Sequence, residues 1–243
     1  MQRLRVMTYN IHAARGLDMR VRSGGKPARL ARIADVIKSA KPDLVALQEV
    51  DVGRARSGAM DMASELATML GMDMRFVPCI EHGTERYGIC TLSSPSLPIL
   101  ESRELRLPRH HDREQRCALI TRHAWDGGEV ELLNAHLSVI FRERPHQVAA
   151  IAQEMLGEAL VIAGDFNMTP WSSAYKVLRR GLTSATRFAR TWPAPAPLVP
   201  LDHILYRGRL ELIDGRAWTE GGARRASDHL PVVAELEHLP MAA

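Results

Sequence analysis

The stretch LVIAGDFNMTPWSSAY, residues 160–175, joins an apolar run to a carboxylate and an amide. Leu160 to Ala163 predicts a buried strand, and Gly164 leads directly into Asp165 and Asn167. A polar group that leaves water without a partner costs roughly 2–7 kcal/mol, depending on the reference state. Other segments of the chain must therefore supply partners for this strand end.

Polar residues end or begin several other predicted strands as well. These residues are Asn10 and His12 after 4–9, Gln48 and Glu49 after 44–47, Asn134 and His136 after 132–133, Asp202 and His203 near 204–206, and Asp228 and His229 before 230–236. In sheet proteins, ligand sites form where strand ends and their loops converge. Carboxylates, amides and imidazoles without cysteine favour a hard divalent metal together with acid–base chemistry.

The remaining pattern alternates apolar, β-rich runs with amphipathic segments. Helices are predicted at 29–40, at 60–70 with Gly71 closing the segment, around PHQVAAIAQEML at 145–156, and at 172–180. Residues 73–137 are β-rich, and Asp126-Gly127-Gly128 is typical of a hairpin turn. The proline-rich stretch 194–200 reads as a loop, because too little chain follows it to form another domain. We therefore predict one α/β domain over residues 1–243.

Composition narrows the class of protein. Apolar residues make up 46% of the 243 positions, which is typical of a globular chain with a sizeable core. Cys79, Cys90 and Cys117 are odd in number and widely spaced, so we expect buried thiols in a reducing compartment rather than disulfides or a zinc cluster. No secretory leader or membrane span is recognisable, and we expect a cytoplasmic monomer. The net charge of +4 weakly favours a polyanionic partner.

The polar segments occur in an order that resembles the endonuclease/exonuclease/phosphatase superfamily, which includes deoxyribonuclease I and the abasic-site endonucleases. The matching strings are TYNIH (8–12), ALQEV (46–50), ERYG (85–88), LNAHLS (133–138), GDFNMTP (164–170), LDHIL (201–205) and SDHLPVV (227–233). They span nearly the whole chain, and GDFN followed by SDHLPV is the most specific part. The resemblance implies a four-layer α/β/β/α sandwich of two mixed β-sheets flanked by helices.

The resemblance also implies metal ligands. Glu49 would be the principal ligand of Mg²⁺, or of Mn²⁺ as a substitute, and Asn10 would assist it. Asp228 matches a position assigned to a second metal or to ligand orientation, although it could instead cap the following strand. His12 stands where other members carry aspartate, which favours one metal over two.

Five further residues match catalytic positions of the family. Asp165 and Asn167 would handle the attacking water and the charge that develops on phosphorus. Asp202 would orient His229, whose free ring nitrogen takes a proton from water. His136 would contact the phosphate and protonate the leaving oxygen. Whether Asp165 or His229 is the general base stays open at this point.

Substrate is less well defined. The first hypothesis is a nuclease acting on DNA or RNA by in-line water attack, with loop arginines such as Arg142 and Arg144 on backbone phosphates. Glu85 is expected as the carboxylate partner of His136. The alternatives are a phospholipid, sphingomyelinase-like or small-molecule phosphodiesterase or phosphatase, and, last, a non-catalytic binding module. Aromatic residues amount to only 5%, which counts against stacking on unpaired bases.

Overall fold

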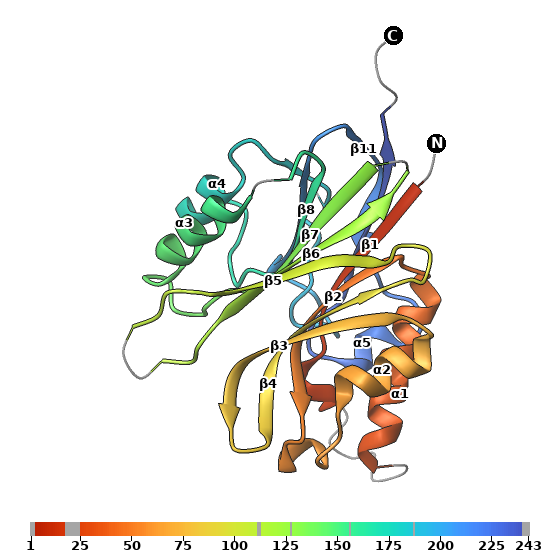
Figure 1. The fold of residues 1–243 in the computed structure, drawn as a ribbon. Helices are drawn as coiled ribbons and strands as arrows, with labels where there is room; N and C mark the ends of the chain where they lie inside the picture. Colours follow the sequence, from red (N-terminus) through yellow and green to blue (C-terminus); the bar gives the residue numbers. More distant parts are fainter. Residues whose placement is uncertain are drawn as a thin grey trace.

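The computed structural model describes residues 3–17, 25–110, 113–126, 128–155, 157–186 and 188–239. Two six-stranded sheets pack face to face, and helices cover their outer faces (Figure 1). Strands β1 (Arg3–Asn10) and β2 (Leu44–Val52) are parallel neighbours in the first sheet, while the second sheet contains one parallel pair of its own. Both sheets are therefore mixed, and the predicted α/β/β/α sandwich is confirmed.

The first sheet has the order β11-β12-β1-β2-β4-β3. Its other strands are β3 (Asp73–His82), β4 (Glu85–Ser93), β11 (Leu210–Ala217) and β12 (Val232–His238). The first and last strands of the chain are neighbours in this sheet, because β12 pairs antiparallel with β1. The last strands thus complete the sheet that contains the first strand.

The second sheet has the order β5-β6-β7-β8-β10-β9. Its strands are β5 (Ile99–Arg106), β6 (Cys117–Trp125), β7 (Gly128–His136), β8 (Leu160–Asp165), β9 (Thr183–Ser184) and β10 (Asp202–Arg207). Hairpin pairing of β6 with β7 confirms the turn expected at 126–128, although Gly127 itself lies outside the described residues. Strand β8, the apolar run of the opening stretch, is buried along its whole length.

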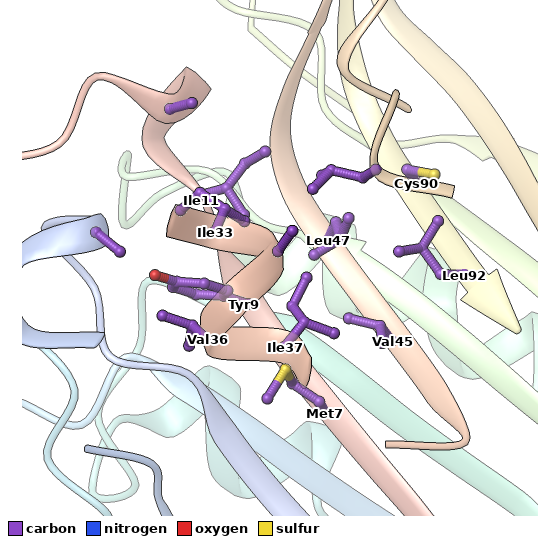
Figure 2. Packing of buried hydrophobic residues seen from close by; sticks show 14 of the residues in the cluster. Met7, Tyr9, Ile11, Ile33, Val36, Ile37, Val45, Leu47, Cys90 and Leu92 are labelled. Carbon is purple, nitrogen blue, oxygen red and sulfur yellow. The ribbon is translucent and has the colours of Figure 1, made fainter. Parts of the chain in front are cut away.

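Three apolar layers hold the sheets and helices together. Helices α1 (Gly25–Ala40) and α2 (Met62–Leu70) pack on the outer face of the first sheet, where Ile33 and Ile37 meet Tyr9, Val45 and Leu47 (Figure 2). Helices α3 (Arg144–Glu154) and α4 (Ser173–Leu178) cover the second sheet (Figure 1). The central apolar layer lies between the sheets and includes Val6, Leu132 and Val161.

Local sequence signals set the helix ends. Asp61 caps α2 by accepting a hydrogen bond from the Ser64 amide at 3.0 Å, and Gly71 closes it with φ 64°. Ser172 caps α4. Helix α1 begins at Gly25, before the start predicted at residue 29 from the apolar stripe. The short helix α5 (Ala223–Ala226) carries no apolar periodicity and was not expected.

The expectation of three buried thiols is wrong for two of the cysteines. Cys79 on β3 and Cys117 on β6 form a disulfide that joins the two sheets, and only Cys90 is a free, buried thiol. The strands that carry the pair are distant in sequence and meet only through the packing of the sheets. Spacing along the chain therefore gave no sign of the bond, and the reasoning that linked free thiols to a reducing compartment no longer applies.

This disulfide is expected to contribute substantially to stability. It closes a loop with a sequence separation of 38, and cross-linking a loop of that size restricts the unfolded chain by about 4 kcal/mol in the entropic account. The double substitution Cys79→Ala with Cys117→Ala should lower the free energy of unfolding by about 2–4 kcal/mol in urea titrations. With reductant present throughout, the gap to the wild type should narrow to the packing loss alone. If the difference in free energy of unfolding between wild type and variant is the same with and without reductant, the disulfide is contradicted.

Candidate active site

The register of the strands brings the predicted site residues to one edge. In the second sheet, His136 at the end of β7 pairs with Asp165 at the end of β8, and Asp165 pairs with Asp202 at the start of β10. In the first sheet, Asn10 ends β1 beside β2. Parallel pairing aligns carboxyl ends, and the antiparallel β10 contributes its amino end to the same edge. The strand ends therefore meet between the two sheets.

Glu49 reaches this edge through an irregularity of β2. The pairing of β2 with β4 shifts between Leu47 and Val50, and Glu49 itself has φ 58°. A left-handed backbone at a residue other than glycine costs about 1–3 kcal/mol and persists only where its surroundings enforce it. The carboxylate of Glu49 faces the site, where its Oε1 accepts a hydrogen bond from Asn10 Nδ2 at 3.1 Å.

Asp165 lies at the centre of the cluster and is only 1% exposed. Its Oδ2 accepts from Asn10 Nδ2 at 3.0 Å, and its Oδ1 accepts from the Asn167 amide at 2.9 Å. The imidazole Nε2 atoms of His136 and His229 lie 3.5 and 3.8 Å from Oδ2. These four groups are the partners that a buried carboxylate at the end of β8 requires, and they come from two other strand ends, a turn and the loop that precedes β12.

Asp202 and His229 form the expected carboxylate–imidazole pair. His229 Nδ1 lies 2.8 Å from Asp202 Oδ2, and both side chains are buried. Burial by itself lowers the pKa of His229, but the negative charges of Asp202 and Asp165 outweigh it and raise that pKa to about 10. The second oxygen of Asp202, Oδ1, is buried without a hydrogen-bond partner among the described residues.

His136 is held in the opposite state. Its pKa lies well below the usual value, first because the ring is buried and then because the cations Arg116 and His229 are close. Arg116 Nη1 lies 2.8 Å from His136 Nδ1, and the guanidinium is nearly buried. A neutral imidazole keeps one N–H but is a far weaker acid than an imidazolium, so contact with the phosphate suits His136 better than protonation of the leaving oxygen.

Of the three expected substrate contacts, Glu85 lies away from His136 and Arg144 is hydrogen-bonded to backbone carbonyls; Arg142 is described below. Glu85 does not pair with His136; it accepts from the Ala55 amide at 3.0 Å and lies 3.7 Å from Arg54. Its strand β4 belongs to the first sheet, whereas β7 belongs to the second. Arg144 donates to the carbonyls of Ser138 and Val139 at 2.7 and 2.6 Å. Its pKa is lowered by burial and raised, to a smaller extent, by the charge of Asp165.

Arg142 and Asp228 lie around the same edge without entering the cluster. The Arg142 guanidinium lies over the Phe141 ring, 5.5 Å from its centroid. Asp228 Oδ1 lies 3.3 Å from His12 Nδ1. Asp228 is therefore paired with the residue that replaces the family's aspartate.

A cavity of about 330 Å³ opens onto the cluster. Its walls combine the predicted residues Glu49, His136, Asp165, Asn167 and His229 with four others, Arg116, Val139, Trp192 and Leu201. Arg116 was not predicted as a site residue. It precedes β6 and reaches His136 only because Ala118 pairs with Ala135. A larger cavity, of about 700 Å³, lies over β5, β6 and β7 and contains none of the cluster residues.

Buried polar side chains support the cluster from below. Asn134 on β7 accepts from Gln48 Nε2 at 2.9 Å and donates to the carbonyls of Leu47 and Cys90, so it bridges the two sheets. His203 on β10 holds the turn after Asp165, because its Nε2 lies 2.7 Å from the carbonyl oxygen of Met168.

The buried His203 predicts a loss of stability in acid. Burial lowers its pKa from 6.5 to about 4, so between these pH values the ring is protonated in the unfolded chain and neutral in the folded chain. The contribution is present above pH 6.5 and is lost as pH falls, reaching about 3 kcal/mol near pH 4. His203→Gln keeps a donor for the Met168 carbonyl but does not titrate. Urea titrations from pH 7 to about pH 5 should show a smaller loss in this variant; equal slopes would contradict the assignment.

The donor set fits a hard divalent cation. Carboxylate oxygens of Glu49 and Asp165 converge on the side-chain amide of Asn10, whose Nδ2 donates to both while its Oδ1 accepts from the His12 backbone amide. Single ligand atoms of Asp165, Asp202 and His229 also lie within 4.8 Å of one another. An imidazole with a raised pKa keeps its proton, and a protonated nitrogen cannot ligate a metal. The oxygen donors around Glu49 are therefore the better ligands, as Mg²⁺ prefers oxygen.

Two mixed sheets with carboxylates, amides and paired imidazoles between their strand ends define a metal-dependent phosphoester hydrolase. The chain belongs to the Endonuclease/Exonuclease/phosphatase family, whose model matches residues 7–229. A comparison with curated proteins finds no match. The resemblance seen in the ordered sequence motifs is thus confirmed at the level of the family.

Solved structures share the fold at low identity. An endonuclease/exonuclease/phosphatase from Beutenbergia cavernae is 23% identical, with a TM-score of 0.78 over 100% of this chain and 74% of that one. A mannosyl-6-phosphatase from Bacteroides thetaiotaomicron is 20% identical, with a TM-score of 0.79 over 96% and 99%. The human Nocturnin catalytic domain with bound sulfate is 22% identical, with a TM-score of 0.74 over 97% and 94%.

Within the described ranges, no helix has the length and apolar character needed to cross a bilayer.

Proposed function

We propose that this protein is a Mg²⁺-dependent phosphodiesterase that hydrolyses its substrate by in-line attack of water. The observation that carries the proposal is the setting of Asp165, which is buried and lies within 4 Å of both imidazoles while two further groups donate to it. Burying an ionised carboxylate costs free energy, which favours a functional role for the charge of Asp165. We also propose that residues 1–243 act as one catalytic domain and as a monomer.

The cation would be held by Glu49 and Asn10, with Mn²⁺ as a substitute for Mg²⁺. When bound, a divalent ion draws charge from a phosphoryl oxygen and so favours attack on phosphorus. The positive-φ bulge supports this role for Glu49, because the backbone strain has no other evident purpose. Asp228 is paired with His12 and would assist from the periphery.

The protein's own residues would move the proton and stabilise the charge. Water attacks phosphorus, its proton passes to Asp165, and the bond to the leaving oxygen breaks. The raised pKa keeps His229 protonated and Asp202 keeps it oriented, so the imidazole can give its proton to the leaving oxygen and then regain one from Asp165. The positions of Asn167 and the neutral His136 in the cavity wall support contacts with the charged phosphoryl oxygens.

Arg116 is the cation that this scheme adds to the family's motif residues. It lines the cavity and contacts His136, and its Nε atom is buried without a hydrogen-bond partner in the described part of the chain. We propose that it binds a phosphoryl oxygen. A fixed guanidinium suits this role because it presents several N–H donors in one plane.

Two substrate classes remain candidates. The net charge of +4 supports nucleic acid, and a nuclease is the first proposal from the sequence. The apolar wall of Val139, Trp192 and Leu201 supports a phospholipid substrate, because a sugar phosphate has no hydrocarbon chain that would pack against it. The cytoplasmic location expected from the sequence loses the support of free thiols, since the Cys79–Cys117 bond favours an oxidising compartment.

Hydrolysis assays with and without metal test the proposal. A soluble aryl phosphodiester, plasmid DNA, single-stranded oligonucleotides, phosphatidylglycerol, sphingomyelin and sugar phosphates would each be incubated with Mg²⁺, with Mn²⁺ and with a chelator. We expect turnover of at least one diester that a chelator abolishes and that added Mg²⁺ restores. Activity that persists in chelator would refute the metal mechanism. Activity on sugar phosphates alone would replace the diesterase by a phosphatase.

A further inference from the structure

Exposed apolar side chains gather at the catalytic edge. The described part of the chain exposes eleven large apolar residues, and six of them come from three loops, at 137–143, 166–172 and 188–201. Five of the six, which we call the apolar rim, are Val139, Phe141, Trp171, Trp192 and Leu198, with exposures from 41% to 69%. The sixth, Phe188, lines a separate cavity with Pro170 and Tyr175. Isolated exposed apolar residues are ordinary, but a group of this kind beside a functional site indicates a binding surface.

The three loops share one end of the second sheet. The first follows β7, the second follows β8, and the third precedes β10, whose first residue pairs with the last residue of β8. The same register that assembles the catalytic cluster therefore gathers the loops. Val139 and Trp192 also line the cavity, so the rim begins at the active site itself.

The backbone under the rim is fixed by hydrogen bonds. The carbonyl of Trp192 accepts from the amides of Leu198 and Val199, each at 2.9 Å. Arg144 holds the Ser138 and Val139 carbonyls on the other side of the cavity. A loop restrained in this way cannot bury its apolar side chains by collapse, so their exposure is a property of the fold. Binding would then cost little ordering entropy.

Cations lie next to the rim. Arg142 follows Phe141 directly and Arg190 precedes Trp192 by two positions, and neither forms an ion pair with another described residue. Tryptophan and phenylalanine prefer the boundary between water and hydrocarbon, and arginine prefers anionic headgroups. Leu198 and Val139 are aliphatic and cannot stack on nucleobases, whereas hydrocarbon accommodates them equally well.

We propose that the apolar rim docks on the surface of an anionic phospholipid bilayer and that the substrate is a phosphodiester in a lipid headgroup of that surface. The proposal rests on the phosphodiesterase function above and specifies its substrate class. Phe141, Trp171 and Leu198 enter the interfacial layer, while Arg142 and Arg190 contact the headgroups. Val139 and Trp192 then continue the apolar surface from the bilayer into the cavity, beside the lipid whose headgroup is cleaved.

Vesicle co-sedimentation separates docking from hydrolysis, because it can be measured in chelator. The rim variant combines Phe141→Ser, Trp171→Ser and Leu198→Ser. The matched control combines Leu100→Ser with Ile213→Ser, which are also exposed apolar residues but lie on β5 and β11. Vesicles contain equal parts of phosphatidylglycerol and phosphatidylcholine, or phosphatidylcholine alone. Turnover of vesicle phosphatidylglycerol and of a soluble aryl phosphodiester is then measured with Mg²⁺.

We expect the wild type and the control to sediment with anionic vesicles, and the rim variant to bind at least about tenfold more weakly. Added salt should weaken wild-type binding because it screens the arginines. The ratio of lipid turnover to soluble-ester turnover should fall by a similar factor in the rim variant. Circular dichroism and a thermal melt verify that each variant is folded.

Four results would overturn the proposal. The wild type does not sediment with anionic vesicles; the rim and control variants bind equally; the rim variant loses affinity for a labelled oligonucleotide but not for vesicles; or its mass in light scattering drops with vesicle binding unchanged, which would assign the rim to a second copy. Turnover of the soluble ester is independent of all four, so a failed phosphodiesterase proposal is recognised separately.

Discussion

His229→Gln is expected to lower kcat on a soluble phosphodiester by about 10³-fold while the protein stays folded. Glutamine can still donate a hydrogen bond to Asp202, so the buried carboxylate keeps a partner. It cannot give a proton to the leaving oxygen. General acid–base groups contribute about 10²–10⁴-fold to rates, and the raised pKa keeps His229 protonated for the role of general acid. Steady-state kinetics with saturating Mg²⁺ measure the loss.

A second histidine on the same edge provides the control. His203→Gln alters a buried imidazole that contacts the Met168 carbonyl and does not line the cavity. It should lose stability in acid, as argued above, and keep kcat within a few-fold at neutral pH. If His229→Gln unfolds or keeps its turnover, the pair with Asp202 is a structural ion pair. If both variants lose kcat equally, the effect belongs to the edge as a whole and not to His229.

The pH dependence of stability offers an independent check on His229. Its pKa is raised from 6.5 to about 10, so the stabilising charge is fully present below pH 6.5 and is lost as pH rises through 10. The sign is opposite to that of His203. A histidine held as a neutral ring would instead make a constant contribution over the same alkaline range, because its ring is unprotonated there in both the folded and the unfolded chain.

The sequence was sufficient for the fold because several independent patterns agreed. Apolar strands such as 160–165 end in residues that are costly to bury, and the family motifs appear in order from residue 8 to residue 233. The pairing of His136 with Asp165 and of Asp165 with Asp202 then follows from the topology. A motif carries this information because Asn10, His136 and Asp165 each occupy the last position of a strand and Asp202 occupies the first.

Features that depend on register or on contacts between the sheets could not be predicted. Arg116 reaches His136 only because β6 pairs antiparallel with β7, and Cys79 meets Cys117 only where the two sheets pack together. Glu85 was expected beside His136 because the string ERYG resembled one in the family. The structure instead places Glu85 at the start of β4 in the first sheet, where it accepts from the Ala55 amide. A sequence motif specifies a residue's type and order, but not the direction of its neighbours.

Glu49→Gln is expected to raise the Mg²⁺ concentration needed for half-maximal activity by at least about 100-fold. Outer-shell substitutions at metal sites already cost about 10–100-fold in affinity, and removal of the principal carboxylate should cost more. Calorimetric titration of Mn²⁺ into the protein without substrate provides a readout that does not depend on turnover. Heat of binding should be detected for the wild type and should disappear in the variant.

Glu49→Gly and Glu85→Gln make this test specific. Glycine adopts φ near 58° without strain, so Glu49→Gly should remove the carboxylate and leave stability unchanged or about 1 kcal/mol higher. A residue whose replacement improves the fold and abolishes metal binding is kept for function alone. Glu85→Gln removes a carboxylate that is paired with Arg54 and should leave the metal titration as in the wild type. If Glu49→Gly binds Mn²⁺ normally, the cation belongs instead to Asp165, Asp202 and His229, and the strained backbone of β2 has some other cause.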